Sequence, residues 1–356
     1  MKAIIIAGGL GTRLRPITYN VPKPIVPLAN KPFVIHQIEL LKRFGINEVI
    51  LNLHYLSDNI KSIFDDGKRL GVKVDYSIEK TPLGTAGAVK NAEEFFDEGP
   101  MIVFNGDILT DMNLEKAIAF HKKKNAKVTL TLTEVEDPTP YGLVITDKDG
   151  RVLEFREKPA WEQVTAHTIN AGIYIVDPSI FKNVPKGKEF SFERQLYPML
   201  LEQGERIYGY VTDAYWMDIG NPEKYLQAHH DILSGDVLAT IPGHKISANI
   251  WVEGKVDINA SAKVKGPSLI GAGSKIAEDV LLDEYVVLGA SVSVGKFSRL
   301  KNCVVHADTT IGEGVRMEDC IIGNHCTIED FSYVGKGVTL ADGSTLKKGT
   351  KIGGGA

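Results

Sequence analysis

The sequence predicts a two-part protein, an α/β domain with a mixed sheet followed by a parallel β-helix. Two observations predict this. Strand-like and helix-like runs alternate from residue 1 to about residue 234, as in sheets covered by helices. After Gly235, large aliphatic residues recur at every sixth position instead. We therefore expect one domain over 1–234, a linker over 235–250 and a repeat domain over 251–356.

In the α/β part, short apolar runs predict strands and longer amphipathic runs predict helices. Closely spaced strand-like runs then predict antiparallel strands that extend the sheet and form a lid. The first strands are predicted at Ala3–Ala7, Glu48–Leu53, Lys73–Ser77 and Met101–Asn105, and the later ones at Val128–Glu134, Gly142–Thr146, Val152–Glu157 and Ile169–Val176. The helices are predicted at Pro32–Phe44, Leu56–Leu70, Thr85–Phe96, Leu114–Lys123, Phe192–Gln203 and Pro222–Leu233.

The six-residue spacing fits neither an α-helix nor an alternating strand. It is typical of a solenoid whose anchor residues stack into one core. The series slips by one residue after Leu300 and again after Met317. The anchors are Ile258, Val264, Ile270, Ile276, Leu282, Leu288, Val294, Leu300, Val305, Ile311, Met317, Ile322, Ile328, Val334, Leu340, Leu346 and Ile352.

Composition excludes several classes of protein. A net charge of −4 over 356 residues gives no electrostatic footprint for nucleic acid. No apolar run approaches the roughly 18 residues of a membrane span, and the chain begins with a strand of the fold, so we expect a cytoplasmic protein. Cys303, Cys320 and Cys326 form no C-x-x-C pair, which indicates core residues rather than disulfides or a zinc site.

A glycine-rich loop directly follows the first strand. Gly8, Gly9 and Gly11 let the chain turn sharply, so that backbone N–H groups can face an anion at the carboxyl edge of the sheet. Arg13 and Lys23 add a planar guanidinium and a mobile ammonium, two complementary ways to hold a triphosphate. The loop fits neither the Rossmann G-x-G-x-x-G pattern nor the P-loop, and the glycines alone indicate only a turn.

Two aspartates are candidate metal ligands. Asp107 follows an apolar strand, which places its carboxylate at the same sheet edge as the glycine loop. Asp218 lies in the segment YWMDIGN. Mg²⁺ accepts one or two carboxylates together with phosphate oxygens and water. Each aspartate can equally be a turn residue, and the linear spacing does not show that the two meet.

The run AGGLGTRLRPITYNVPKP resembles the signature of the sugar-1-phosphate nucleotidyltransferases, in which G-x-G-T-R is followed by Pro-Lys. Four further segments match the family in order along the chain: PLGTAG after Glu79, Tyr141-Gly142, Glu157-Lys158-Pro159 and Asn170-Ala171-Gly172. The hexads resemble the left-handed β-helix family. The resemblance thus implies a Rossmann-like nucleotidyltransferase domain followed by a left-handed parallel β-helix of hexapeptide repeats.

The resemblance also implies roles for individual residues. Asp107 and Asp218 would hold Mg²⁺ together. The residues implied in nucleotide binding are Ala7, Gly8, Gly9, Gly11, Thr12, Arg13, Glu79, Pro82, Gly84 and Thr85, and those implied in binding the sugar phosphate are Lys23, Gly142, Glu157, Lys158 and Asn170. Without the resemblance, Glu157-Lys158 would be an ordinary solvated pair and Thr85 a helix cap.

The implied reaction is an in-line displacement. A sugar 1-phosphate attacks the α-phosphorus of a nucleoside triphosphate, and pyrophosphate leaves. Such catalysis rests on positioning and charge neutralisation, for which the catalytic candidates are Arg13, Lys23, Asp107, Lys158 and Asp218. Mannose-1-phosphate guanylyltransferases are the most similar subfamily, although they often have a serine where this chain has Gly106.

Three alternatives remain at this point. Thymidylyl-, uridylyl- and adenylyltransferases acting on glucose 1-phosphate share the core motifs. The β-helix could carry acyltransferase activity with His306 or His325 as general base. The chain could also be a non-catalytic regulatory subunit that binds nucleotide sugars. In each case we expect self-association through the β-helix, because stacked coils leave apolar edges to cover.

Overall fold

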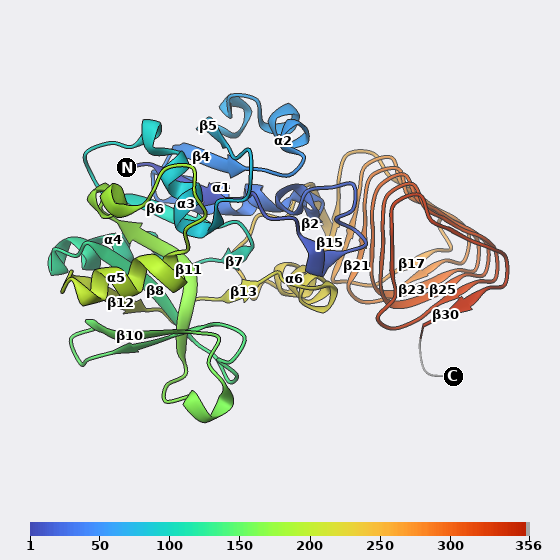
Figure 1. Cartoon of the computed structure of the whole chain (residues 1–356). Coiled ribbons are helices and arrows are strands. Elements are labelled where there is room, and N and C mark those ends of the chain that lie inside the picture. Colours follow the sequence, from blue (N-terminus) through green and yellow to red (C-terminus); the bar gives the residue numbers. More distant parts are fainter. Residues whose placement is uncertain (354–356) are drawn as a thin grey trace. The chain divides into compact units, whose positions relative to one another are not determined.

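The computed structural model describes residues 1–353, which pack as two compact units. The first contains residues 1–9 and 37–216, and the second contains residues 10–36 and 217–353 (Figure 1). The glycine-rich signature therefore divides between the units, since Gly8 and Gly9 belong to the first and Gly11, Arg13 and Lys23 to the second.

A nine-stranded mixed sheet forms the centre of the first unit. Its strand order is β10-β9-β11-β6-β1-β4-β5, with β8 pairing to β11 and β12 pairing to β8. The strands are β1 (Ala3–Ile6), β4 (Glu48–Leu53), β5 (Lys73–Ile78), β6 (Met101–Asn105), β8 (Val128–Glu134), β9 (Gly142–Thr146), β10 (Val152–Glu157), β11 (Thr168–Val176) and β12 (Ile207–Val211). Strands β6, β1, β4 and β5 are parallel to one another, whereas β11 runs antiparallel to β6. The prediction of a parallel sheet extended by antiparallel strands is confirmed.

The helices agree with the sequence in position and differ in extent. They are α1 (Phe33–Arg43), α2 (Ser57–Phe64), α3 (Gly84–Asn91), α4 (Leu114–Lys124), α5 (Tyr197–Glu202) and α6 (Pro222–Ser234). The helix predicted over 56–70 ends at Phe64, because the next residue, Asp65, adopts φ 47° and leaves the α-helical region. Among residues 1–353, no helix is both long and apolar enough to cross a membrane.

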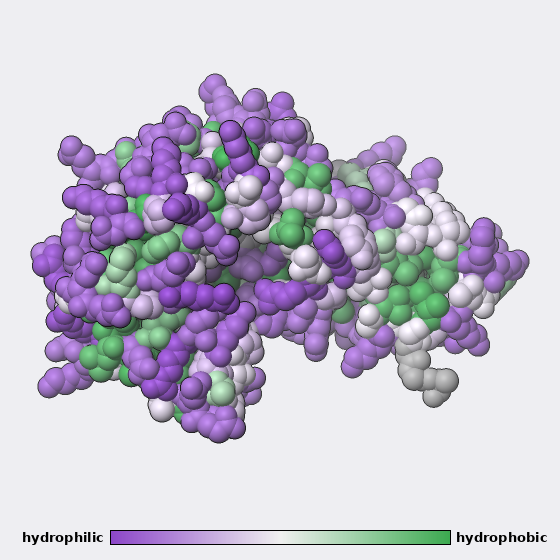
Figure 2. Space-filling view, viewed as in Figure 1, coloured by the Kyte–Doolittle hydropathy of each residue, from purple (hydrophilic) through white to green (hydrophobic). Residues whose placement is uncertain are grey.

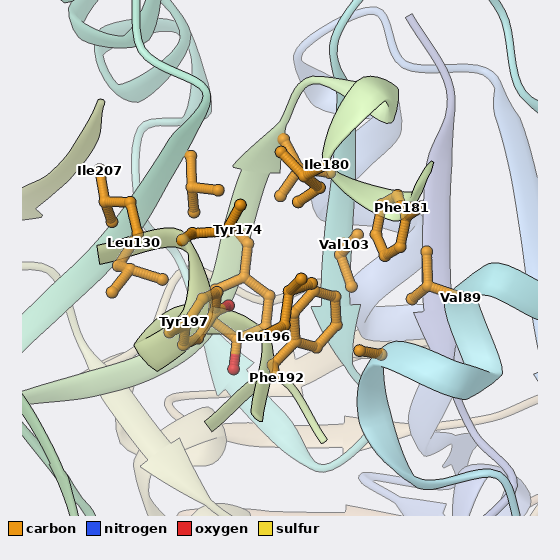
Figure 3. Close-up of a cluster of buried hydrophobic side chains, with 14 of the residues drawn as sticks. Val89, Val103, Leu130, Tyr174, Ile180, Phe181, Phe192, Leu196, Tyr197 and Ile207 are labelled. Carbon is orange, nitrogen blue, oxygen red and sulfur yellow. The ribbon is translucent and has the colours of Figure 1, made fainter. Parts of the chain in front are cut away.

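Helix α5 and the segment before it cover one face of the sheet. Tyr174 of β11, Phe192 and Tyr197 pack their rings together at centroid distances of 5.3–5.8 Å, and all three are buried. Figure 3 shows these rings beside Leu196 and the aliphatic side chains of the sheet. This apolar cluster fixes residues 191–197 against the end of β11, which matters for the polar groups nearby.

The second unit contains a parallel β-helix whose coils are drawn as triangles in Figure 1. The hairpin of β14 (His244–Ser247) and β15 (Ile250–Val252) leads into it. The coil strands are β16 (Asp257–Ile258), β17 (Lys263–Val264), β18 (Ser268–Ile270), β19 (Lys275–Ile276), β20 (Leu281–Leu282), β21 (Val286–Leu288), β22 (Ser293–Val294), β23 (Arg299–Val305), β24 (Thr310–Ile311), β25 (Arg316–Ile322), β26 (Thr327–Ile328), β27 (Tyr333–Val334), β28 (Thr339–Leu340), β29 (Thr345–Leu346) and β30 (Lys351–Ile352).

The predicted anchors stack in register along three rows. One row runs Ile258, Ile276, Val294, Ile311, Ile328 and Leu346. The second runs Val264, Leu282, Leu300, Met317, Val334 and Ile352, and the third Ile270, Leu288, Val305, Ile322 and Leu340. Each slip in the spacing falls at a tightened corner, where Asn302 or Asp319 adopts positive φ and one strand continues over two faces.

The ends of the β-helix cover their anchors less completely than the middle does. Leu288 and Leu300 are fully buried, whereas Leu340 and Ile352 of the last coil are only half-buried. Figure 2 shows hydrophobic side chains gathered at the open end of the coils. Among the described residues, these half-buried anchors form an apolar edge of the stack.

Candidate active site

The glycine loop begins where β1 ends. The Ala7 N–H donates to the Asn52 carbonyl oxygen at 2.9 Å, which keeps the chain in the sheet for one more residue. A Cβ on Gly8 would lie 3.1 Å from Oε1 of Glu79, whereas a Cβ on Gly9 would meet nothing within 4 Å. The loop therefore packs against Glu79 at its first glycine and offers bare backbone at its second, as close approach of a phosphate requires.

Glu79 organises the segment expected to hold the nucleobase. Its side chain is 6% exposed and accepts a hydrogen bond from the Leu83 N–H at 2.9 Å. Burial raises the pKa of this carboxyl, and the Leu83 N–H opposes the shift. Pro82 and Gly84 are exposed at the turn that this bond closes. Glu79 thus shapes the turn, and Pro82 and Gly84 present its outer surface.

Thr85 is not a helix cap. Helix α3 begins at Gly84 without a side-chain cap, and the Thr85 hydroxyl donates instead to Oε2 of Glu193 at 2.9 Å. The same hydroxyl accepts from the Phe192 N–H at 2.8 Å. Thr85 therefore joins α3 to residues 191–193, a segment that sequence reasoning did not connect with the site.

Asn170, Tyr174 and Glu193 form a polar chain beside the aromatic cluster. Nδ2 of Asn170 donates to the Tyr174 hydroxyl at 2.9 Å, and that hydroxyl lies 3.5 Å from Oε1 of Glu193. Oδ1 of Asn170 accepts from the Gly172 N–H at 3.0 Å. The predicted sugar contact at Asn170 is thus oriented by Tyr174 and Gly172.

Gly142 and Glu157 lie next to each other on paired strands. A Cβ on Gly142 would stand 2.5 Å from the Phe155 ring and 3.2 Å from Oε2 of Glu157, so glycine is required here. Burial raises the pKa of Glu157, and the negative charge of Glu193 raises it further. Two carboxylates in one half-buried region suit a polyhydroxylated ligand, whose hydroxyls can donate to both.

Lys158 follows directly after β10 with φ 49°. Its N–H donates to the Tyr141 carbonyl oxygen at 2.9 Å, and the residue is exposed. A lysine held in the left-handed region costs backbone energy, which the hydrogen bond to Tyr141 helps to offset. The positive φ therefore changes the direction of the backbone at Lys158, where strand β10 has ended.

Asp107 lies where β6 ends beside β1. The Gly106 N–H donates to the Ile6 carbonyl oxygen at 2.9 Å, and any side chain at residue 106 would overlap that oxygen. Asp107 is half-buried rather than exposed. Asn113 caps helix α4 by accepting from the Lys116 N–H, so Asp107 does not have that role. Asp107 therefore stands at the sheet edge from which the glycine loop departs.

In the second unit, Gly11 begins the loop at φ 62° and precedes a short 3₁₀ turn over Thr12–Leu14. The Thr18 hydroxyl donates to the Gly11 carbonyl oxygen at 2.8 Å, and a Cβ on Gly11 would lie 3.2 Å from Cβ of Lys23. Thr12 and Arg13 are exposed and Lys23 is half-buried. Gly11 and Lys23 are thus neighbours, although eleven residues of loop separate them.

Asp218 is 8% exposed and forms an ion pair with Nζ of Lys224. A Cβ on Gly220 would lie 2.9 Å from Oδ2 of Asp218 and 3.0 Å from Nη1 of Arg13, so both side chains reach the space over this glycine. Asn221 caps helix α6, which leaves Asp218 for another role. The structure therefore brings together Arg13 and Asp218, and adds Lys224, which sequence reasoning missed.

The candidate catalytic residues come from both units. Asp107 and Lys158 belong to the first, whereas Arg13, Lys23 and Asp218 belong to the second. Within residues 1–353, no group of three or more His, Cys, Asp or Glu side chains is arranged to hold a metal ion.

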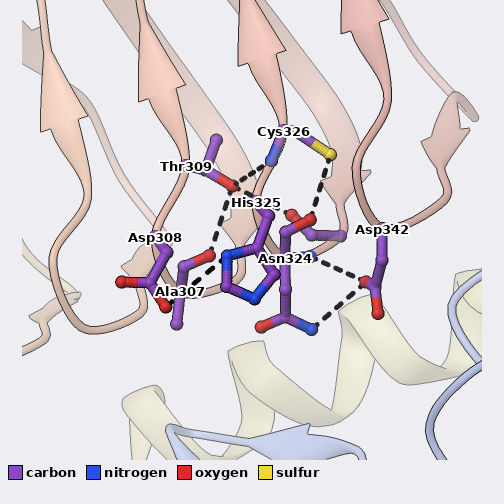
Figure 4. Close-up of polar contacts among 8 residues, drawn as sticks. Ala307, Asp308, Thr309, Asn324, His325, Cys326 and Asp342 are labelled. Atoms are coloured by element: carbon purple, nitrogen blue, oxygen red, sulfur yellow. Dashed lines mark hydrogen bonds and ion pairs between the residues drawn. The ribbon is translucent and has the colours of Figure 1, made fainter.

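The two histidines of the acyltransferase alternative differ in access. His306 is 4% exposed, and burial lowers its pKa to about 4. His325 has a side chain that is 69% exposed, and its Nδ1 lies 3.8 Å from the carboxylate of Asp308 (Figure 4). Beside it, Asp342 accepts from the backbone and side-chain nitrogens of Asn324. His306 is thus enclosed within the protein, and His325 lies at an open corner of the coils.

Comparison with known families identifies both parts of the chain. Residues 2–235 match the family model described as nucleotidyl transferase. The chain belongs to the nucleotidyl transferase family. Residues 247–352 match the LbH domain of EIF2B subunit epsilon, a left-handed β-helix. The predicted family resemblance, the fold class and the assignment as an enzyme are confirmed.

Curated relatives match nearly the whole chain. A mannose-1-phosphate guanylyltransferase from Mycobacterium tuberculosis is 36% identical, with 83% of this chain and 82% of the relative covered. A probable mannose-1-phosphate guanylyltransferase 2 from Arabidopsis thaliana is 35% identical, with 96% and 93% covered. A UTP–glucose-1-phosphate uridylyltransferase from Synechocystis is 34% identical, with 92% and 88% covered.

Solved structures match the transferase domain. HddC from Yersinia pseudotuberculosis, complexed with GMP-PN, is 35% identical with a TM-score of 0.57. It covers 65% of this chain, while 99% of HddC is covered in return. A putative glucose-1-phosphate thymidylyltransferase from Bacillus anthracis has a TM-score of 0.59 at 24% identity, which shows a shared fold.

Proposed function

We propose that the protein transfers a nucleoside monophosphate from GTP to mannose 1-phosphate, forming GDP-mannose and pyrophosphate. The observation that carries this proposal is the set of guanylyltransferase relatives, which match this chain over both its parts. The geometry at Gly220 adds support, because a guanidinium and a carboxylate converge over a residue without a side chain. That arrangement suits a phosphate that arrives with a cation.

In this reaction the transferring phosphoryl group carries charge that the protein must offset. Arg13 and Lys23 would bind the triphosphate and hold the departing pyrophosphate. Lys158 would bind the phosphate of the sugar, and Glu157 and Asn170 would accept and donate hydrogen bonds at its hydroxyls. Gly8, Gly9 and Gly11 would let the phosphates approach the backbone, while Glu79, Pro82, Gly84 and Thr85 would shape the surface for the base.

Asp107 and Asp218 would together hold Mg²⁺. Their donor set fits this ion, since both residues offer carboxylate oxygens, and Mg²⁺ completes its shell with phosphate oxygens and water. When bound, the ion neutralises charge at the α-phosphate. The proposal requires that Asp107 and Asp218 converge and that Asp218 exchanges its Lys224 partner for the ion.

One substrate experiment tests the proposal. Pyrophosphate release would be measured with GTP, UTP, ATP and dTTP, each against mannose 1-phosphate and glucose 1-phosphate, with and without Mg²⁺. We expect GTP and mannose 1-phosphate to give a kcat/KM at least about tenfold above every other pair, a difference of about 1.4 kcal/mol in transition-state binding. A preference for another pair would contradict the proposed substrates.

The Synechocystis relative supports a second candidate, transfer from UTP to glucose 1-phosphate. In the same panel this candidate predicts that UTP with glucose 1-phosphate is the best pair. The acyltransferase alternative has less support, because His306 is enclosed and already hydrogen-bonded to Tyr225. Incubation with acetyl-CoA and a nucleotide sugar, followed by thiol release, would test His325 in that role.

We also propose that the β-helix mediates self-association. The half-buried Leu340 and Ile352 at its last coil support this, because a second copy could cover them. Light scattering on the full chain should give a mass above that of one chain, and Leu340→Glu should lower it. Thr327→Glu, at an exposed position on the side of the coils, is the control. A wild-type mass equal to that of a single chain would contradict the proposal.

A further inference from the structure

Residues 27–32 form a hairpin that local sequence preferences do not explain. Strands β2 (Pro27–Leu28) and β3 (Lys31–Pro32) pair across a turn in which Ala29 has φ 46° and Asn30 φ 59°. Asparagine tolerates the left-handed region, but alanine there is disfavoured by roughly 1–2 kcal/mol. A tight turn with alanine at such a position needs support from outside the hairpin.

Helix α6 and the β-helix supply that support. The Ala29 N–H donates to Nδ1 of His229 at 3.3 Å. Nδ2 of Asn30 donates to Oε1 of Glu253 at 2.7 Å and to the Leu288 carbonyl oxygen at 2.9 Å. The turn is therefore held by one residue of the helix and two of the coils, all within the second unit.

A buried chain of hydrogen bonds extends this support. The Tyr225 hydroxyl of α6 donates to the Pro27 carbonyl oxygen, and it lies 3.0 Å from Nε2 of His306 in the β-helix. Because the hydroxyl has one proton and gives it to Pro27, His306 must donate from Nε2. Tyr225 is 1% exposed, so water does not replace either bond. Burial keeps His306 neutral by lowering its pKa to about 4, which is compatible with this donor role.

The hairpin is directly connected to Lys23. A 3₁₀ turn over Lys23–Ile25 precedes β2, leaving only Val26 between them. Lys23, Leu28 and Tyr225 line the same small cavity of ≈ 10 Å³. A shift of Pro27 would therefore move the backbone that aims Lys23.

We propose that Tyr225 and His306 are positioning residues, through which the β-helix holds the 27–32 hairpin and thereby Lys23 for binding the triphosphate. This inference rests on the proposed role of Lys23 in phosphate binding. It gives the repeat domain a part in the transferase reaction without placing any of its residues in contact with substrate.

The test compares variants of the full chain in two measurements. Tyr225→Phe removes the hydroxyl and keeps the ring, and His306→Ala removes the donor. We expect both to speed hydrogen exchange in residues 10–36 and to raise KM for the triphosphate about tenfold, with a smaller change in kcat. His306→Gln, which retains a side-chain N–H donor, should restore most of the wild-type KM.

Tyr285→Phe is the matched control, because its hydroxyl bonds Ser234 at the end of the same helix and does not reach the hairpin. If Tyr225→Phe and His306→Ala behave like Tyr285→Phe in exchange or in KM, the positioning inference is overturned. Wild-type protein that neither turns over any triphosphate nor binds a non-hydrolysable GTP analogue would overturn the proposed function instead. The exchange measurement needs no turnover and therefore separates the two failures.

Discussion

The two parts of this molecule use their residues in opposite ways. In the β-helix, each anchor is one of several equivalent side chains stacked along a row, as Leu282, Leu300 and Met317 are. At the sheet edge, Asp107 occurs once, directly after the contact between the Gly106 N–H and the Ile6 carbonyl oxygen. The repeated anchors stabilise the fold, whereas the single residues are the candidates for catalysis. Changes in the first should alter stability, and changes in the second should alter rate.

The largest effect is expected in the middle of the stack. Leu300→Ala should lower the free energy of unfolding by about 2–5 kcal/mol, because it leaves a cavity in a fully buried row. Ile352→Ala, in the last and half-buried coil, should cost clearly less. Denaturant unfolding of both variants would measure the difference. Equal losses would contradict the view that the middle of the stack carries more of the stability.

The next effect should appear in rate alone. Asp107→Asn and Asp218→Asn should each lower kcat by about 100- to 1000-fold, or about 2.7–4 kcal/mol at the barrier, if they hold the metal proposed above. The melting temperature of Asp107→Asn should stay close to that of wild type. Asp137→Asn, at an exposed carboxylate that accepts hydrogen bonds from the N–H and hydroxyl of Thr139, is the control. Wild-type rates in both variants would refute the metal assignment.

Lowering the pH should destabilise the second unit more than the first. Burial lowers the pKa of His306 and of His36 to about 4 and that of His229 well below 6.5, all in the second unit. The unfolded chain takes up protons at these sites below pH 6.5, whereas the folded protein does so at His306 and His36 only near pH 4 and at His229 only well below pH 6.5. Stability is therefore complete above pH 6.5 and falls as the pH drops toward 4, by roughly 3 kcal/mol for a shift such as that of His306.

In the first unit, His121 has a similar shift to about 4, again because of burial. Hydrogen exchange followed from pH 7 to pH 4.5 should therefore show protection falling more in the second unit than in the first. His306→Gln should flatten part of this dependence. Equal loss of protection in both units would contradict the expectation that His306, His36 and His229 make the second unit more sensitive to acid.

The smallest expected effect is a loss of stability where Gly106 contacts the backbone of Ile6. Gly106→Ala should destabilise the first unit by about 1–3 kcal/mol, because its Cβ would overlap the Ile6 carbonyl oxygen and push β6 from β1. The same change at Gly9, where a Cβ meets nothing, should leave stability nearly unaltered. Thermal unfolding of the two variants provides the comparison. If Gly9→Ala lowered the stability as much as Gly106→Ala, overlap with the Ile6 carbonyl oxygen would not be the cause.

What the sequence could predict follows the same division. The anchors from Ile258 to Ile352 were predictable because their spacing is local and repeated. Strands such as Glu48–Leu53 were also recognisable from short apolar runs. Asp107 and Asp218 were candidate ligands from their positions, but their pairing followed only from the family resemblance, since each can equally be a turn residue.

Contacts between distant residues could not be predicted. Glu193 reads as an ordinary helix residue, and only folding brings it to Thr85 and near Glu157. Asn30 bonds Glu253, more than two hundred residues away, so nothing local links the signature loop to the coils. The extent of the predicted 56–70 helix was wrong because the chain adopts positive φ at Asp65, directly after Phe64, despite the apolar pattern around it.

The ion pair between Lys224 and Asp218 has a consequence for the order of events. A carboxylate enclosed to this degree is expensive to leave unbalanced, and the lysine ammonium already balances it. If Asp218 holds the proposed Mg²⁺, binding of the ion is therefore an exchange of one positive partner for another. We therefore expect Mg²⁺ to compete with the Lys224 ammonium for this carboxylate.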